Sequence, residues 1–208
     1  MRQLLFLICL LSITSCDIKK DRHFYLNKDL KTYFDYKLGS YWIYHDDALN
    51  ITDTHKIIQY RSEMRGEHSD TYFDYQESIS ITYATTNDII IYDQLEATNT
   101  NYSLMHRTFN SEKPNNTYFR DEIEMSIYGG TFNADSNYMI LADYTVNGIK
   151  YTNVLHYIND MCINNYKSGL TETVKVEYFI AKNIGVIEKR YSSPTETQCW
   201  KLVSYHLN

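Results

Sequence analysis

The sequence contains few of the residues that interrupt regular structure or cross-link a chain. Among 208 residues there are only seven Gly, two Pro and four Cys. Repeats and low-complexity tracts are also absent. Basic residues are fewer than acidic ones, with 20 Lys and Arg against 26 Asp and Glu. Because no basic patch is available to neutralise phosphates, the sequence predicts no nucleic-acid partner.

The motifs that carry common catalytic and metal chemistry are missing as well. The sequence has no His-Glu-x-x-His, Gly-x-Ser-x-Gly, Gly-x-x-x-x-Gly-Lys or Gly-x-Gly-x-x-Gly. Its seven His residues are isolated from one another, whereas a metal site needs several converging ligands. His45, Asp46 and Asp47 are adjacent, but neighbours in a strand point in different directions. We therefore expect no enzyme, no metal and no cofactor.

The first 16 residues have the layout of a secretory signal that ends in a lipobox. Arg2 gives a positive start, residues 4–11 form an apolar run, and small residues precede Cys16. The apolar run is far shorter than the roughly 20 residues of a membrane-spanning helix. We therefore expect cleavage before Cys16 and acylation of its thiol, which would anchor the protein to a membrane. An ordinary cleaved signal, with Cys16 unmodified, is the alternative.

This layout divides the chain into three parts. Residues 1–15 are expected to be a signal peptide, residues 16–32 a lipidated N-terminus and polar tether, and residues 33–208 a single β domain. Removing the signal removes one charged residue, Arg2, so the mature chain has 19 basic and 26 acidic residues, a net charge of −7. We expect a location in the cell envelope, on the periplasmic or surface face of an outer membrane.

Two cysteines remain in the mature domain. Cys9 is removed with the signal and Cys16 would be acylated, which leaves Cys162 and Cys199. In an oxidising compartment these two could form a disulfide, and closing that loop would stabilise the fold by a few kcal/mol on the chain-entropy model. Two buried free thiols are the alternative, and the spacing matches no zinc motif.

Most of the chain shows the two-residue period of β-strands. Tyr is abundant, with 21 residues, and it favours half-buried strand surfaces. Ile79, Ile81 and Tyr83 alternate with Ser and Thr, which predicts an apolar core face and a polar solvent face. Residues 54–60, 89–92 and 122–127 are also expected to be strands. The predicted fold class is mainly β: one antiparallel, strongly twisted sheet, as a half-barrel or a sandwich, with little helix.

The clearest local prediction is a hairpin at Asn147-Gly148, since a type I′ turn needs positive φ at both central positions. Its register pairs Val146 with Ile149, Tyr144 with Tyr151, Ile140 with Leu155 and Tyr138 with Tyr157. A slip by one residue would bury Asp143 and Lys150, so we expect the register to be fixed.

Signals for helix and loop are weak. Residues 27–34 could form one helical turn, and residues 156–167 could form a short helix or a loop around Cys162. The Asn-rich residues 110–117 are expected to form an exposed loop.

Both ends of the mature domain resemble a group of small lipoproteins that is frequent in Bacteroidota. The start, Leu38-Gly39-Ser40-Tyr41-Trp42-Ile43-Tyr44, looks like the group's L-x-x-G-x-x-W-x-Y opening, although Leu38 and Gly39 are adjacent here. Residues 178–189 and 199–205 are similar to its closing Y-F-A-K-G-x-G-x-V-K hairpin and final W-x-L-x-x-Y strand. The group is largely of undefined function, so the resemblance implies a fold and no catalytic residue.

We therefore expect a non-catalytic, membrane-anchored module that binds an unknown protein, lipid or glycan or supports envelope assembly. Tyr41, Trp42 and Tyr44 are the candidates for a ligand-facing wall, although core packing is the commoner role of such residues. A concave face filled by its own side chains would rule out a small ligand. The alternatives are a hydrolase whose residues converge only in three dimensions, or a structural subunit of an outer-membrane complex.

Overall fold

A computed structural model describes most of the chain after the expected signal. The described residues are 20–68, 72–86, 89–97, 101–110, 118–119, 125–128, 138–165, 170–194 and 197–208. The signal segment, Cys16 and residues 111–117 of the expected loop lie outside them, and so do residues 122–124 of an expected strand.

The described chain is mainly β-structure with one helix, which confirms the predicted fold class. In chain order the elements are β1 (Lys20–Phe24), α2 (Lys28–Phe34), β2 (Tyr41–Asp46), β3 (Ile51–His68), β4 (Tyr72–Thr85), β5 (Ile89–Ala97), β6 (Asn101–Asn110), β7 (Tyr118–Phe119), β8 (Met125–Tyr128), β9 (Tyr138–Val146), β10 (Ile149–Asn165), β11 (Leu170–Ala181), β12 (Gly185–Ser192) and β13 (Thr197–His206).

All strands belong to one open sheet with the order β7-β6-β5-β4-β3-β2-β13-β12-β11-β10-β9, and β8 pairs with β6. Neighbouring strands in this order are antiparallel. The exception to the prediction is β1, which runs parallel to residues 72–76 of β4. Since β5 pairs only with residues 78–84 of β4, β1 occupies the edge that β5 leaves free.

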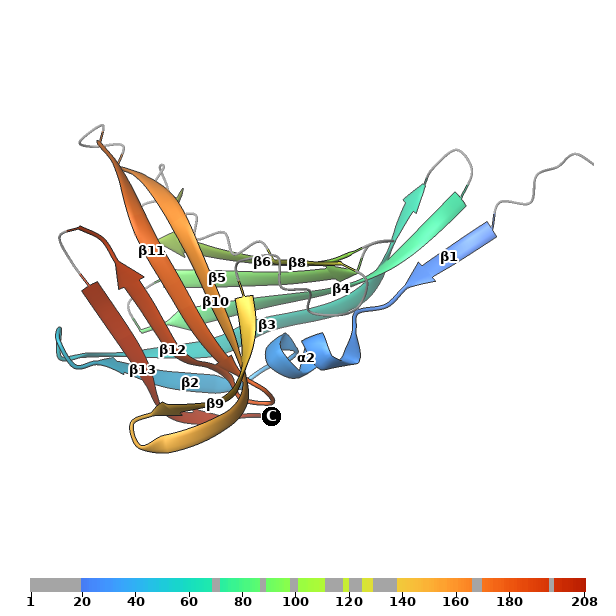
Figure 1. Cartoon of the computed structure of the whole chain (residues 1–208). Helices are drawn as coiled ribbons and strands as arrows, with labels where there is room; N and C mark the ends of the chain where they lie inside the picture. The colour runs from blue at the N-terminus through green and yellow to red at the C-terminus, as the bar shows by residue number, and fades with distance from the viewer. Residues whose placement is uncertain are drawn as a thin grey trace, which may run out of the picture.

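The sheet bends strongly, so its two halves face each other at an angle. Strands β3 to β6 run across Figure 1, while β10 to β13 stand steeply against them, and α2 lies at the inner side of the bend. The short strand β2 and the last strand, β13, pair in the middle of the sheet. The backbone N–H of the final residue, Asn208, donates to the Ser40 hydroxyl at 3.1 Å.

Helix α2 is longer than the single turn expected from the sequence. The Asn27 side chain accepts a hydrogen bond from the Asp29 N–H at 2.7 Å and so caps the helix start. Leu26 and Leu30 are 3% and 1% exposed, so part of the segment expected as a tether packs into the core.

The strand pattern of residues 78–83 is confirmed on its apolar face. Ile79, Ile81 and Tyr83 are buried, with 1%, 0% and 9% exposure. Ser78 departs from the expected solvent face, because it is only 2% exposed. Among the described residues its hydroxyl has no hydrogen-bond partner.

The hairpin at Asn147-Gly148 is confirmed in turn type and register. Both central residues have positive φ, 51° and 78°, and all four expected pairs are formed. The exposed Lys150 and Asp143 form an ion pair at 2.7 Å. The expected helix or loop is wrong for residues 156–165, because β10 continues to Asn165 by pairing with β11, and residues 166–167 lie outside the described ranges.

Candidate functional site

The inner side of the bend contains a cavity of about 60 Å³ that is partly open to solvent. This volume is above the roughly 10–15 Å³ that a cavity needs to hold a water molecule. We call this cavity the aromatic pocket, because seven of its twelve lining residues are aromatic: Tyr33, Phe34, Tyr36, Trp42, Tyr44, Tyr83 and Tyr178. The remaining lining residues are His55, Ile91, Asp93, Gly185 and Val186.

One wall comes from α2 and β2, which are close in sequence. Along β2 the burial alternates, so Trp42 and Tyr44 point inward with 3% exposure each. The Trp42 indole donates to the Ile184 carbonyl at 2.6 Å, and the Tyr44 hydroxyl donates to the Val186 carbonyl at 3.0 Å. The Tyr36 ring meets the Trp42 ring edge-on at 5.1 Å. These bonds hold the rings in place across the bend.

The opposite walls come from strands far away in sequence. Tyr83 pairs with Ile91 between β4 and β5, and Asp93 lies two residues further along β5. Tyr178 comes from β11, and its hydroxyl lies 2.9 Å from that of Tyr191. Tyr33 and Tyr36 donate their hydroxyls to backbone carbonyls. These hydroxyls are bonded to protein groups and do not point freely into the cavity. Most of the pocket surface is therefore formed by the aromatic rings.

A polar cluster lies beside one wall. The His55 Nε2 atom is 3.0 Å from the Asp53 carboxylate and 3.3 Å from the Lys189 ammonium. Thr86 donates both its backbone N–H and its hydroxyl to the other oxygen of Asp53. Asp53 and His55 are 4% and 8% exposed. Burial raises the pKa of Asp53, but the His55 and Thr86 hydrogen bonds and the charges of His55 and Lys189 outweigh it and lower this pKa to about 2.

This lowered pKa predicts a pH dependence of stability. The Asp53 pKa falls from its ordinary value of 3.8 to about 2 on folding, so its contribution is complete above pH 4 and is lost between about pH 4 and pH 2. The loss should be about 2 kcal/mol. Urea unfolding of the wild type and of Asp53→Asn should show a stability difference that shrinks over this window. A difference independent of pH would contradict the assignment.

Gly185 allows the β11–β12 turn to approach the pocket closely. Its φ is +100°, and a Cβ atom there would lie 3.1 Å from the Trp42 Nε1 atom and 3.3 Å from Tyr36. Gly148 also has positive φ, but a Cβ there would meet nothing within 4 Å.

We expect Gly185→Ala to destabilise the fold more than Gly148→Ala. Both variants carry the strain of Ala at positive φ, about 1–2 kcal/mol, and only the first also crowds Trp42. Denaturant midpoints of the two variants measure the difference. Equal losses would mean that the close approach to Trp42 carries no energy.

The three aromatic residues expected to face a ligand are divided between the two faces of β2. Trp42 and Tyr44 line the pocket, whereas Tyr41 points to the other face and stacks on His206 at 5.7 Å. The alternation of the strand separates them.

Cys199 is a free thiol in the structure, so the disulfide with Cys162 is not formed. β12 and β11 lie between β13 and β10. At about 4.8 Å for each strand, β13 and β10 are roughly 14 Å apart across the sheet, which is beyond the reach of a disulfide. The register places Cys199 level with Ile158, so Cys162 lies further along β10 as well. Burial and then the charge of Glu188 raise the pKa of the Cys199 thiol. Cys16 lies outside the described residues.

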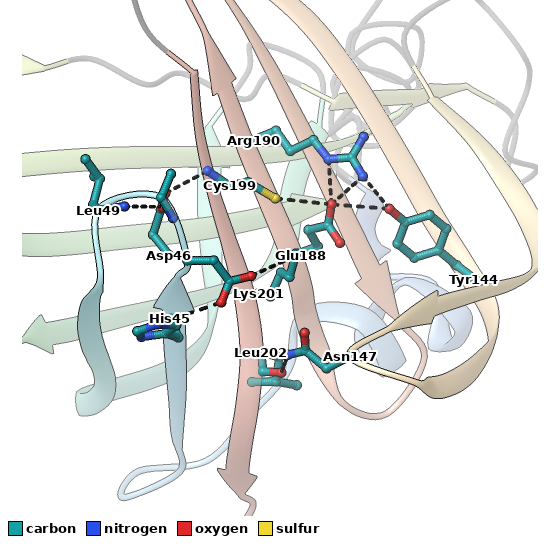
Figure 2. A network of polar contacts seen from close by, with 12 residues as sticks. His45, Asp46, Leu49, Tyr144, Asn147, Glu188, Arg190, Cys199, Lys201 and Leu202 are labelled. Carbon is teal, nitrogen blue, oxygen red and sulfur yellow. Dashed lines mark hydrogen bonds and ion pairs between the residues drawn. The ribbon is translucent and has the colours of Figure 1, made fainter.

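His45, Asp46 and Asp47 do not all converge: the His45 Nε2 atom is 3.8 Å from the Asp47 carboxylate, but Asp46 points elsewhere. Figure 2 shows Asp46 turned toward the turn at Leu49 and the backbone of Cys199, while Lys201 and His45 lie on the other side. Asp47 pairs with Lys201 at 2.9 Å. Within the described ranges, no group of three or more His, Cys, Asp or Glu residues could hold a metal ion.

A second polar network lies under the β9–β10 hairpin (Figure 2). Glu188 is 3% exposed and accepts hydrogen bonds from Arg190 at 2.5 Å and from the Tyr144 hydroxyl at 3.2 Å. The Asn147 side chain at the hairpin tip donates to the Leu202 carbonyl at 3.0 Å. These hydrogen bonds connect the hairpin to β12 and β13. We therefore assign the network a structural role.

Comparisons with protein-family models, with curated proteins and with solved structures found no significant match. No helix in the described part of the chain is long and apolar enough to cross a membrane.

Proposed function

We propose that this chain is a lipid-anchored bacterial envelope protein whose β domain binds a small molecule in the aromatic pocket, without catalysing a reaction. The single observation that supports binding is the pocket itself. It is concave, mostly aromatic and supplied with a few polar groups, which is the usual composition of a small-ligand site.

Anchoring is supported by the lipobox at Cys16. Mass spectrometry of the natural product should find an N-terminal Cys16 that carries fatty acids. Cys16→Ser should move the protein from the membrane fraction to the soluble fraction. An intact Met1, or a new N-terminus without fatty acid, would contradict the anchor. Co-purification with outer-membrane proteins would instead favour the structural-subunit alternative.

Binding can be tested by filling the pocket. Ile91 lines it and is 6% exposed, so Ile91→Phe should occupy its space. Ile58 is 43% exposed and outside the lining, so Ile58→Phe is a matched control. In ligand-observed NMR with a library of small organic fragments, we expect hits on the wild type and on Ile58→Phe. Ile91→Phe should bind them at least about tenfold more weakly, a loss of about 1.4 kcal/mol. No hits, or equal binding by both variants, would contradict the proposal.

The Asp53–His55 contact favours one second candidate, hydrolysis. A carboxylate that orients an imidazole beside a pocket is the arrangement of a general base. Chromogenic ester, phosphate and glycoside substrates test it. Hydrolysis lost in both Asp53→Asn and His55→Gln would establish an enzyme, and no hydrolysis of any of them by the wild type would leave the binding function.

A further inference from the structure

If the aromatic pocket binds a small molecule, as proposed above, its walls favour one sign of charge on that molecule. The rings of Trp42, Tyr44 and Tyr83 all line the cavity. The face of an aromatic ring carries a negative potential and attracts a cation within about 6 Å of the ring centroid. A wall built mainly of such rings therefore suits a positively charged group.

The protein already holds one of its own ammonium groups in this manner. The Lys189 Nζ atom lies 5.3 Å from the ring centroid of Tyr44 and 5.3 Å from that of Trp200. Tyr44 is both a partner of Lys189 and a wall of the pocket. Ammonium–ring stabilisation therefore already operates on one of the rings that line the cavity.

The charge of Lys189 does not make the pocket repel cations, because Asp53 offsets it. Lys189 lies 3.3 Å from the His55 Nε2 atom, which in turn is 3.0 Å from the Asp53 carboxylate. The Lys189 charge is also one of the causes that lower the Asp53 pKa. A positive and a negative group thus both contact His55 beside the wall.

Asp93 adds a carboxylate to the lining itself. Its negative charge contributes to the raised pKa values of two tyrosines of the wall. Burial, and after it the charge of Asp93 and a hydrogen bond to it, raise the pKa of Tyr83 well above the ordinary value. Burial also raises the pKa of Tyr44, with Tyr36, Asp53 and Asp93 as smaller causes. The carboxylate makes the potential inside the cavity more negative.

We propose that the ligand of the aromatic pocket is a small organic cation of the alkylammonium type, held by the ring faces of Trp42, Tyr44 and Tyr83 with Asp93 as its counter-charge. This specifies the ligand class of the proposed function. A quaternary ammonium headgroup suits the pocket because it needs no hydrogen-bond acceptor, and most tyrosine hydroxyls of the wall already donate to protein groups.

Choline and its uncharged isostere 3,3-dimethylbutan-1-ol provide the test, because they have the same shape and differ in charge. Isothermal titration of the full-length protein should give a Kd for choline at least about tenfold lower than for the alcohol. Asp93→Asn should weaken choline by a similar factor and leave the alcohol unchanged. Asp143→Asn, at an exposed carboxylate of the β9–β10 hairpin, removes the same charge far from the pocket and should change neither.

Each outcome separates this proposal from the proposed function. If the alcohol binds as tightly as choline, the cation proposal fails and the pocket remains a ligand site. If neither binds while neutral fragments do, the same conclusion holds. If nothing binds, both fail. Should Asp93→Asn not fold, the wild-type ratio of the two Kd values still decides the question.

Discussion

Replacing Trp42 by Ala is expected to reduce the free energy of unfolding by about 3–5 kcal/mol, the usual loss for a large buried aromatic residue. The indole is 3% exposed, and its N–H donates to the Ile184 carbonyl across the bend of the sheet. Truncation would remove the ring contacts with Tyr36 and Tyr83 and leave that carbonyl without its donor. The lost stability would come from breaking the contact that joins β2 to the β11–β12 turn.

Chemical denaturation of three variants measures this effect. Trp42→Phe keeps a ring but loses the N–H, so we expect an intermediate loss. Tyr41→Ala changes the neighbouring residue on the opposite, half-buried face of β2, and its loss should be clearly smaller. If Trp42→Ala costs no more than Tyr41→Ala, the indole does not hold the two halves of the sheet together.

Asp46→Ala is expected to cost about 2–3 kcal/mol, because it removes the acceptor of three backbone N–H groups. Asp46 is fully buried, and it accepts from Ala48 at 2.9 Å, Leu49 at 3.0 Å and Cys199 at 2.8 Å. These bonds close the β2–β3 turn and connect it to β13 (Figure 2). Without the carboxylate, the N–H of Cys199 would lack a partner inside the sheet.

Asp47→Ala is the matched control for this variant. The Asp47 side chain is 70% exposed and pairs only with surface groups, so its removal should change stability little. Denaturant midpoints compare the two variants. Equal losses would show that charge in this turn, and not the bonds made by Asp46, determines its stability.

The features that the sequence predicts well are those set by neighbouring residues. Asn147-Gly148 fixes a turn by backbone conformation alone, and the register of β9 and β10 follows from that turn. The burial of Ile79 and Ile81 follows from alternation along one strand. Features that depend on distant partners could not be predicted in this way. β10 extends to Asn165 because β11 pairs with it.

The candidate site follows the same rule. Trp42 and Tyr44 are recognisable in the sequence because they lie two residues apart on one strand, and the same alternation places Tyr41 on the opposite face. Tyr83, Asp93 and Tyr178 reach the same cavity from β4, β5 and β11, and nothing near them in sequence marks them. The inward positions of Tyr83 and Ile81 were the only available signal, and they indicate core as readily as a pocket wall.

The claim that the aromatic pocket is a ligand site is tested most directly by NMR on protein labelled at isoleucine methyl groups. Ile91 lines the pocket, while Ile149 is 54% exposed on the β9–β10 hairpin and serves as the internal reference. During titration with a binding fragment, the Ile91 methyl signal should shift and saturate while the Ile149 signal stays in place. Fragments that bind but leave the Ile91 signal unmoved, or that move both signals alike, would contradict the claim.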